Sequence, residues 1–273
     1  MSYLWSIMEL ESGICMEHCL PSTTIRKTPM LFVHGNFCGS WCWRNFLKYF
    51  ARRGTSCYAL NFRGHWLSKG HAELGNAVTE HYVADVEDCL QAIGVEVILV
   101  GHSMGGIVSQ KVAEQNRIKS LILLDSAPCR EITETYFQSN PKINQMLQDL
   151  FKHQPDGTVV MGREEEKIKK ILFEKDKVSE EILAQTIAYL GSESAHVIKT
   201  HPFLSVDPKK INCPVYVMGR TVFGNEKNPN LWHALADYYN ADDRCISGDI
   251  SHCMIMENDW QEHAGLVEKW CFG

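Results

Sequence analysis

The sequence predicts an α/β protein with a mostly parallel central sheet, helices on both faces of the sheet and an inserted helical cap. Between Pro29 and Leu124, short apolar runs alternate with longer amphipathic segments, a pattern typical of the strands and helices of a parallel sheet. From residue 128 to residue 207 the chain becomes charged and helical, and the alternation resumes afterwards. We therefore expect a core made of residues 1–127 and 208–273 and a cap made of residues 128–207.

Six short apolar runs are expected to form the parallel strands. Runs that are apolar almost throughout suit strands that are buried on both faces of a sheet. The N-terminal residues 3–19 are expected to add a hairpin at the edge of the sheet. The six predicted strands are residues 30–33, 57–60, 97–100, 121–124, 215–218 and 244–246.

Apolar residues at helical spacing predict four core helices. Ser40 is expected to cap the first of them, and the third is expected to begin after Ser103. In the cap, Ser179-Glu180-Glu181 opens another helix, and the charges around it indicate a solvated face. The apolar positions of the core helices are Trp43, Phe46, Leu47 and Phe50; Val83, Val86, Leu90 and Ile93; Ile107, Val108 and Val112; and Leu266, Val267 and Trp270.

Composition restricts the class of protein and its partners. Of the 273 residues, 45% are hydrophobic and 22% charged, as in a globular protein, and the net charge of −6 argues against a nucleic-acid partner. No apolar run is long enough to span a membrane. The N-terminus has acids at Glu9 and Glu11 where a signal peptide would be apolar, and the 11 cysteines are odd in number. We therefore expect a cytoplasmic protein whose partner is a small molecule.

A sharp turn between a strand and a helix is predicted at Gly101-His102-Ser103-Met104-Gly105-Gly106. This arrangement fits the nucleophile elbow G-x-S-x-G, in which glycines leave room for a strained serine. The Ser103 hydroxyl is then exposed above the sheet, at the N-terminus of a helix whose free N–H groups favour developing negative charge. His102 is expected to point away from the site. Ser103 is therefore the candidate nucleophile.

Three further motifs accompany this turn. His34-Gly35-Asn36 and Arg63-Gly64-His65 each follow a predicted strand, and His252 precedes the closing helix. Together with the turn at Ser103, they resemble the motifs of the α/β hydrolases, in the branch that includes monoacylglycerol lipases, small esterases and related cap-bearing enzymes. The resemblance implies the α/β-hydrolase fold.

The resemblance covers residues 29–127 and 213–273. Where the family commonly has R-G-x-G-x-S, this chain has Trp66 in place of the second glycine. Phe37, Trp41 and Trp66 flank the predicted site along the sequence. They are candidate substrate-binding residues, with core packing as the commoner fate of such side chains.

Ester hydrolysis passes through an oxyanion, which needs hydrogen-bond donors. One donor is expected from the residue after the nucleophile and another from the loop after an earlier strand. These are the backbone N–H groups of Met104 and, by similarity to the family, Asn36, with Phe37 as the alternative to Asn36.

A serine hydroxyl needs a base, and the fold's order of serine, acid and histidine favours His252. The acid departs from the family pattern, because Val222 stands at its usual position. Asp125, directly after the strand 121–124, is the preferred substitute, since both strand ends open onto the same edge of the sheet. Glu226, another acid, or a dyad without any acid are the alternatives.

The sequence therefore predicts a serine hydrolase that cleaves a carboxylic ester, or a lactone, of a small to medium hydrophobic substrate through an acyl-enzyme. Thioester cleavage, C–C bond hydrolysis and acyl transfer use the same constellation. A non-catalytic ligand-binding relative is the alternative from another class. No P-loop or G-x-G-x-x-G fingerprint appears, and Cys15-Met16-Glu17-His18-Cys19 lacks the second half of a zinc site, so we expect neither cofactor nor metal.

Overall fold

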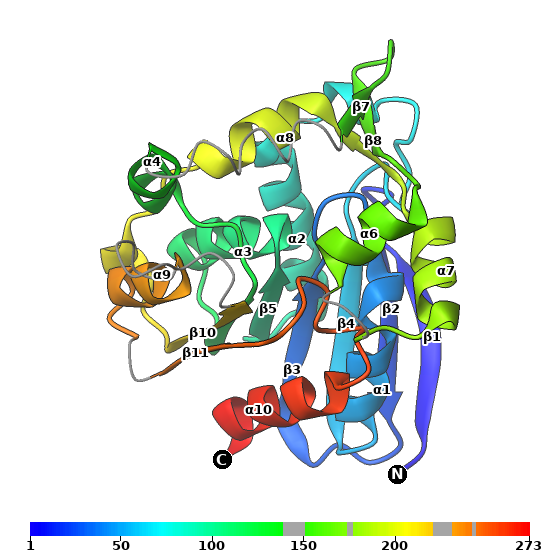
Figure 1. Cartoon of the computed structure of the whole chain (residues 1–273). Helices are drawn as coiled ribbons and strands as arrows, with labels where there is room; N and C mark the ends of the chain where they lie inside the picture. The colour runs from blue at the N-terminus through cyan, green and yellow to red at the C-terminus, as the bar shows by residue number, and fades with distance from the viewer. Residues whose placement is uncertain (139–150, 174–176, 221–230, 242–243) are drawn as a thin grey trace.

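An eight-stranded sheet organises the chain, as the computed structural model shows (Figure 1). The structure describes residues 1–138, 151–173, 177–220, 231–241 and 244–273. The strands follow the order β1-β2-β4-β3-β5-β6-β10-β11, and β3 to β6, β10 and β11 run parallel. Their bounds are β1 (Tyr3–Glu9), β2 (Cys15–Pro21), β3 (Arg26–Val33), β4 (Thr55–Asn61), β5 (Ile98–His102), β6 (Ser120–Leu124), β10 (Val215–Arg220) and β11 (Cys245–Gly248).

The predicted strands are confirmed, with ends that differ by a few residues. The N-terminal hairpin is also confirmed, because β1 pairs with β2 and β2 pairs with β4, both antiparallel. Side chains of β3 alternate between two apolar clusters: Leu31 lies in one cluster and Phe32 in the other. Both faces of the sheet are thus buried, as the continuous apolar runs predicted.

Helices cover both faces of the sheet. Residues of α2, α3 and α9 belong to the cluster that contains Leu31, and residues of α1 and α10 belong to the cluster that contains Phe32. Figure 1 shows α1 and α10 together on one side of the sheet. The bounds are α1 (Arg44–Ala51), α2 (Thr79–Ile93), α3 (Met104–Gln115), α9 (Leu231–Tyr238) and α10 (Trp260–Phe272).

The predicted cap at Ser40 is wrong. Ser40 begins a short 3-10 helix, η1 (Ser40–Trp43), whose N-cap is Gly39, and α1 starts only at Arg44. The Ser40 hydroxyl makes no hydrogen bond with the described residues, while the Ser40 N–H donates to Oδ1 of Asn61 over 2.7 Å. Because η1 occupies residues 40–43, α1 begins four residues after Ser40, and the Ser40 hydroxyl cannot cap it.

The inserted segment is less helical than predicted. It contains a three-stranded antiparallel sheet in the order β7-β8-β9, which the sequence analysis missed because strands of three or four residues leave no measurable periodicity. The predicted cap of α7 is confirmed, since Oγ of Ser179 accepts from the N–H of Ile182. The elements are α4 (Arg130–Gln138), β7 (Phe151–His153), β8 (Thr158–Met161), α6 (Glu165–Leu172), α7 (Glu180–Tyr189), β9 (Ser192–Ser194) and α8 (Ala195–Thr200).

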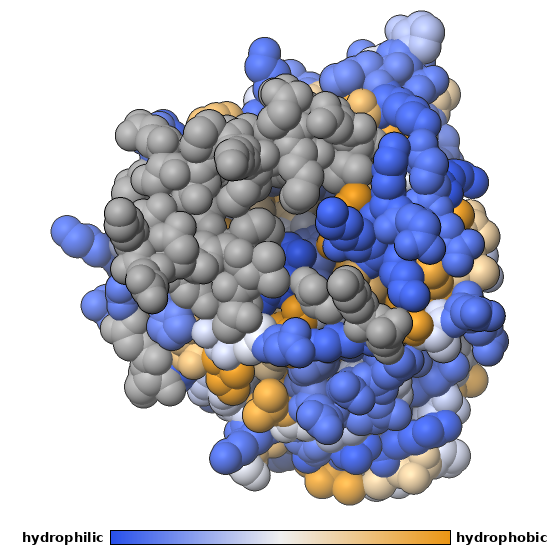
Figure 2. Space-filling model, viewed as in Figure 1, coloured by the Kyte–Doolittle hydropathy of each residue, from blue (hydrophilic) through white to orange (hydrophobic). Residues whose placement is uncertain are grey.

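Apolar residues lie mainly inside the molecule. On the face shown in Figure 2, hydrophilic residues dominate, and apolar residues appear in small separate patches. Among the described segments, no helix is both long enough and apolar enough to cross a membrane.

A buried acid joins the inserted segment to the core. Glu193 of β9 is fully buried and accepts hydrogen bonds from the Tyr82 hydroxyl, from Nε2 of His65 over 3.2 Å and from the Ser194 N–H over 2.8 Å. Nδ1 of His65 lies 3.0 Å from the carbonyl oxygen of Arg63, so both ring nitrogens face acceptors. This arrangement suits an imidazolium ion paired with a carboxylate.

The two groups shift each other's pKa. Burial favours neutral imidazole, but the carboxylate of Glu193 outweighs burial and raises the pKa of His65 above 6.5. Burial would raise the pKa of Glu193, yet His65 and the hydrogen bonds lower it below 4.5. His65 therefore contributes stability below pH 6.5 and loses it as the pH rises through its raised pKa. Glu193 contributes stability above pH 4.5 and loses it as the pH falls through its lowered pKa.

We expect Glu193→Gln to lower the free energy of unfolding by about 3–5 kcal/mol, because it leaves buried partners without their anion. The loss should be largest between pH 4.5 and 6.5, where both contributions are present. Urea unfolding at pH 5.5 and at pH 9 measures it. Tyr82→Phe, which removes one hydrogen bond and keeps the ion pair, should cost less, about 1.5–3 kcal/mol. A Glu193→Gln protein as stable as the wild type at pH 5.5 would contradict the ion pair.

Candidate active site

The carboxyl ends of the parallel strands meet at one edge of the sheet, where ligands bind in open α/β sheets. Four residues other than glycine have a positive φ there, each just beyond a different strand from β3 to β6. Such backbone strain is typical of functional sites. One other described residue of this kind, Asn240, lies elsewhere. The four are Phe37 (64°), Trp66 (46°), Ser103 (54°) and Asp125 (40°).

Ser103 lies in the turn between β5 and α3, with φ 54° and ψ −126°. The neighbouring chain passes very close: a Cβ on Gly105 would lie 2.3 Å from the carbonyl oxygen of His34, and one on Gly101 would lie 2.6 Å from that of Gly105. Side chains at these two positions would therefore break the turn. Ser103 itself is partly exposed, whereas both of its neighbours in the chain are buried.

His252 lies in the loop after β11 and packs against the residue before Ser103. The ring centroids of His252 and His102 are 4.7 Å apart, and Nε2 of His102 donates to the carbonyl oxygen of His252 over 2.8 Å. Burial lowers the pKa of His102 to about 3, so this ring is neutral and can donate only through its one N–H. His102 therefore holds the His252 loop, as suits a structural residue, but its ring lies against the candidate base and does not point away from it.

Asp125 lies beside His252 although 127 residues separate them in sequence. Oδ2 of Asp125 is 2.5 Å from Nδ1 of His252. Its side chain is almost fully buried, and its N–H donates to the carbonyl oxygen of Met218 over 2.7 Å. Burial would raise the pKa of Asp125, but the charge of Arg220 and the hydrogen bond from His252 outweigh burial and lower it. Asp125 is therefore ionised, and Nδ1 of His252 carries the shared proton.

The structure thus brings Asp125 and His252 into contact and packs His252 against the residue next to Ser103. His252 contacts Asp125 directly and His102, the neighbour of Ser103, through its ring. Glu226 and Val222 lie outside the described residues.

The loop after β3 runs directly against the serine. A Cβ on Gly35 would lie 2.7 Å from Cβ and 3.2 Å from Oγ of Ser103. Asn36 is the next residue, and Met104 begins α3, where backbone N–H groups have no partner within the helix. Met104 thus follows Ser103 in the chain, and Asn36 follows the glycine that lies against Ser103 in space; their role as oxyanion donors stays a prediction.

The three predicted substrate-binding aromatic residues pack against aromatic rings of the inserted segment. Phe37 is 1% exposed and packs 5.3 Å from Phe151, and Trp41 is 5% exposed and packs 5.6 Å from Tyr189. Trp66 is partly exposed and lies 4.8 Å from the same tyrosine ring. Trp66 adopts a positive φ of 46°, which explains why glycine suits this position and means that the tryptophan is held in a strained backbone conformation.

Arg220, at the end of β10, is a site residue that the sequence analysis missed. Its N–H donates to Oδ1 of Asp125 over 3.1 Å, and its Nε lies 2.9 Å from Oδ2. One indication was present in the sequence. Arg220 is a charged residue directly after Gly219, two residues before Val222, which stands at the family's usual position of the acid.

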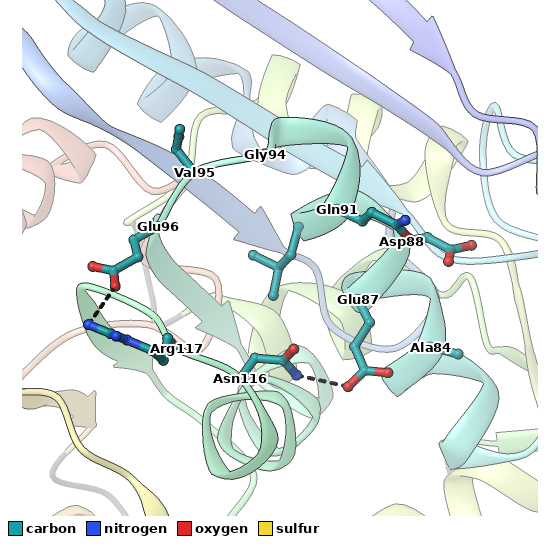
Figure 3. Close-up of a pocket in the computed structure, with 10 residues that line it drawn as sticks. Ala84, Glu87, Asp88, Gln91, Gly94, Val95, Glu96, Asn116 and Arg117 are labelled. Carbon is teal, nitrogen blue, oxygen red and sulfur yellow. Dashed lines mark hydrogen bonds and ion pairs between the residues drawn. The ribbon is translucent and has the colours of Figure 1, made fainter.

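A hollow elsewhere on the surface is not part of this site. It lies between the C-terminal ends of α2 and α3, at the amino ends of β5 and β6 (Figure 3). Two contacts join residues that line it: an ion pair of Glu96 with Arg117 over 3.2 Å and a hydrogen bond from the Asn116 amide to Glu87 over 2.8 Å. No serine, cysteine or histidine lines it.

Parts of the chain resemble known proteins in sequence. A family model described as alpha/beta hydrolase fold matches residues 28–160. A carbendazim-hydrolyzing esterase of Nocardioides sp. is 33% identical over 99 residues, which are 35% of this chain and 40% of that protein. Putative esterase/lipase 2 of Mycoplasma pneumoniae is 33% identical over 149 residues, 50% of this chain and 53% of that protein. The chain thus matches about half or less of the length of these curated relatives.

Solved structures resemble the chain over almost its whole length. Tomato methylketone synthase I, complexed with 2-tridecanone, has a TM-score of 0.71 at 15% identity, covering 90% of this chain and 98% of that one. Polyneuridine aldehyde esterase has a TM-score of 0.69 at 14% identity, covering 90% of this chain and 100% of that one. At these identities the likeness shows the fold alone.

Proposed function

We propose that this chain, which has the α/β-hydrolase fold, is a serine hydrolase that cleaves a carboxylic ester or a lactone. One observation carries the proposal: an ionised, buried Asp125 lies 2.5 Å from Nδ1 of His252, beside the strained turn that exposes Ser103. Nucleophile, base and acid arranged in this way recur on unrelated folds, and their geometry identifies them more reliably than their position in sequence.

Asp125 sets the chemistry by fixing the proton of His252 on Nδ1. Nε2 is then left without a proton and can accept one from the Ser103 hydroxyl as its oxygen attacks the acyl carbon. The backbone N–H groups of Met104 and Asn36 stabilise the oxyanion of the tetrahedral intermediate. His252 then protonates the leaving group, and an acyl-enzyme remains on Ser103.

A water molecule completes the cycle. His252 takes its proton, the resulting hydroxide attacks the acyl carbon, and the acid product leaves as Ser103 regains its proton. Asp125 stabilises the imidazolium in both halves of the reaction and itself stays ionised.

The inserted segment, residues 128–207, acts in this proposal as a cap on the core of residues 1–127 and 208–273. Its two ends are joined by a hydrogen bond from the Arg130 N–H to the carbonyl oxygen of Leu204 over 3.0 Å. Its aromatic contacts with Phe37, Trp41 and Trp66 favour a small to medium hydrophobic substrate. One relative is named as a carbendazim-hydrolyzing esterase, which supports ester hydrolysis.

The cysteines support a reducing compartment. All eleven are free thiols in the structure, and eight of them are buried. Buried thiols pack as small hydrophobic side chains. We therefore propose that the protein works in the cytoplasm.

We expect the purified protein to hydrolyse p-nitrophenyl acetate and butyrate faster than p-nitrophenyl palmitate, and to lose this activity on labelling by a fluorophosphonate. Release of p-nitrophenol measures the rate, and the mass of the labelled protein measures the stoichiometry. Parallel assays with a lactone, a thioester and a vinylogous diketone decide between ester, thioester and C–C bond cleavage. A folded sample that neither hydrolyses nor reacts with the fluorophosphonate would instead indicate a ligand-binding protein.

A further inference from the structure

Arg220 holds the candidate acid from two directions. Its backbone N–H donates to Oδ1 of Asp125 over 3.1 Å, and its side-chain Nε lies 2.9 Å from Oδ2. Oδ2 is the oxygen that also contacts Nδ1 of His252 over 2.5 Å. The contact between Nε and Oδ2 is an ion pair, so Arg220 fixes the carboxylate through the backbone hydrogen bond to Oδ1 and through its charge beside Oδ2.

The same guanidinium lies next to the candidate base. Nη2 of Arg220 is 3.5 Å from Nδ1 of His252. Since Nδ1 already gives its proton to Asp125, this contact is a close approach of a positive charge and not a second hydrogen bond. The Arg220 side chain is 13% exposed, so solvent screens its charge only in part.

We propose that Arg220 is a positioning residue of the hydrolytic site, which locks the carboxylate of Asp125 toward His252 and uses its charge to oppose protonation of the His252 ring. This inference rests on the proposed function. It assigns to Arg220 two effects: the arginine orients the acid, and its positive charge disfavours a second positive charge on the neighbouring His252 ring.

Other titratable groups lie near His252 among the described residues. From β5, His102 is neutral, since burial lowers its pKa to about 3. In the loop of His252 itself, burial raises the pKa of Cys253 well above its usual value, so it is an uncharged thiol. Glu257 faces the Ser251 N–H over 3.0 Å and Nε2 of His263 over 2.5 Å.

Asp249 of this loop is also paired. Asp249 contacts Nζ of Lys177 over 3.0 Å. Within the part of the chain that the structure describes, Arg220 is thus the full positive charge recorded in contact with the Asp125–His252 pair.

Two variants separate charge from shape. Arg220→Gln removes the charge but keeps a side chain that can donate to Asp125, and Arg220→Lys keeps the charge without the planar fork. Arg244→Gln is the matched control. Its guanidinium donates to the carbonyl oxygens of Val215 and Asn240, and Val215 begins β10 at the opposite edge of the sheet.

We expect the acid limb of the pH profile of kcat/KM to move about one pH unit higher in Arg220→Gln, because a nearby charge shifts a titration by about 1–3 units and this one is partly screened. Arg220→Lys should keep the wild-type midpoint, and Arg244→Gln should keep both midpoint and rate. An NMR titration of the His252 ring in the same variants gives the same shift without any substrate. Circular dichroism confirms that each variant is folded.

An unchanged or lower midpoint in Arg220→Gln, or an equal shift in Arg220→Lys, would overturn the assignment. The two proposals fail in different ways. If the protein is no hydrolase, no variant has activity, while the NMR titration still reports whether Arg220 acts on His252. If Arg220 has no such role, hydrolysis persists and both titrations match the wild type.

Discussion

Replacement of Ser103 with alanine should reduce the turnover of p-nitrophenyl acetate by a factor on the order of 10⁶, as removal of the nucleophile does in a serine protease. The serine oxygen forms the covalent bond of the acyl-enzyme, and no other hydroxyl among the described residues occupies the turn between β5 and α3. The variant should also lose all labelling by the fluorophosphonate. Steady-state rates, corrected for spontaneous hydrolysis, measure the loss.

A second serine on the same helix provides the control. The hydroxyl of Ser109 donates to the carbonyl oxygen of Gly105 over 2.7 Å and is buried away from solvent. Ser109→Ala removes one hydroxyl of α3 and should leave turnover essentially unchanged. Full activity in Ser103→Ala would show that hydrolysis depends on another nucleophile.

Asp125→Asn should reduce turnover by a factor on the order of 10⁴, by analogy with the acid of the serine proteases. The asparagine amide can donate a hydrogen bond to Nδ1 of His252. Nδ1 then carries no proton, and the single ring proton lies on Nε2. The base is left in the wrong tautomer, with no lone pair facing Ser103. Because Ser103 stays in place, slow fluorophosphonate labelling should persist. The ratio of kcat values for the variant and the wild type measures the effect.

Glu226→Gln tests the rival assignment of the acid. If Asp125 orients His252, this variant should turn over nearly as fast as the wild type. A loss below about tenfold in Asp125→Asn, far short of the serine-protease case, together with a large loss in Glu226→Gln, would move the acid to Glu226. Small losses in both variants would favour a dyad of Ser103 and His252.

The sheet could be predicted from the sequence because its strands are short, apolar throughout and separated by amphipathic helices. The turn at Ser103 could be predicted because its glycines are required by close backbone contacts: Gly105 faces the carbonyl oxygen of His34. Signals of this kind are local, since they depend on residues near one another in the chain.

Features that depend on pairing between distant segments were harder to predict. Met218 pairs with Leu124 across β10 and β6, which places Arg220 beside Asp125. The sequence contains both residues but not the register that brings them together, so the acid was one of several alternatives and the arginine was missed. The strands β7 to β9 were missed for a different reason, because their pairing stabilises segments too short to show a period of two.

The trapped acyl-enzyme tests the central claim most directly. Wild-type protein is mixed with p-nitrophenyl acetate, quenched in acid within the first turnover, digested and examined by mass spectrometry. Our account predicts one acetyl group, on the peptide that contains Ser103, and none in Ser103→Ala. Acetyl on another residue, or rapid turnover with no acetylated peptide at any quench time, would contradict it.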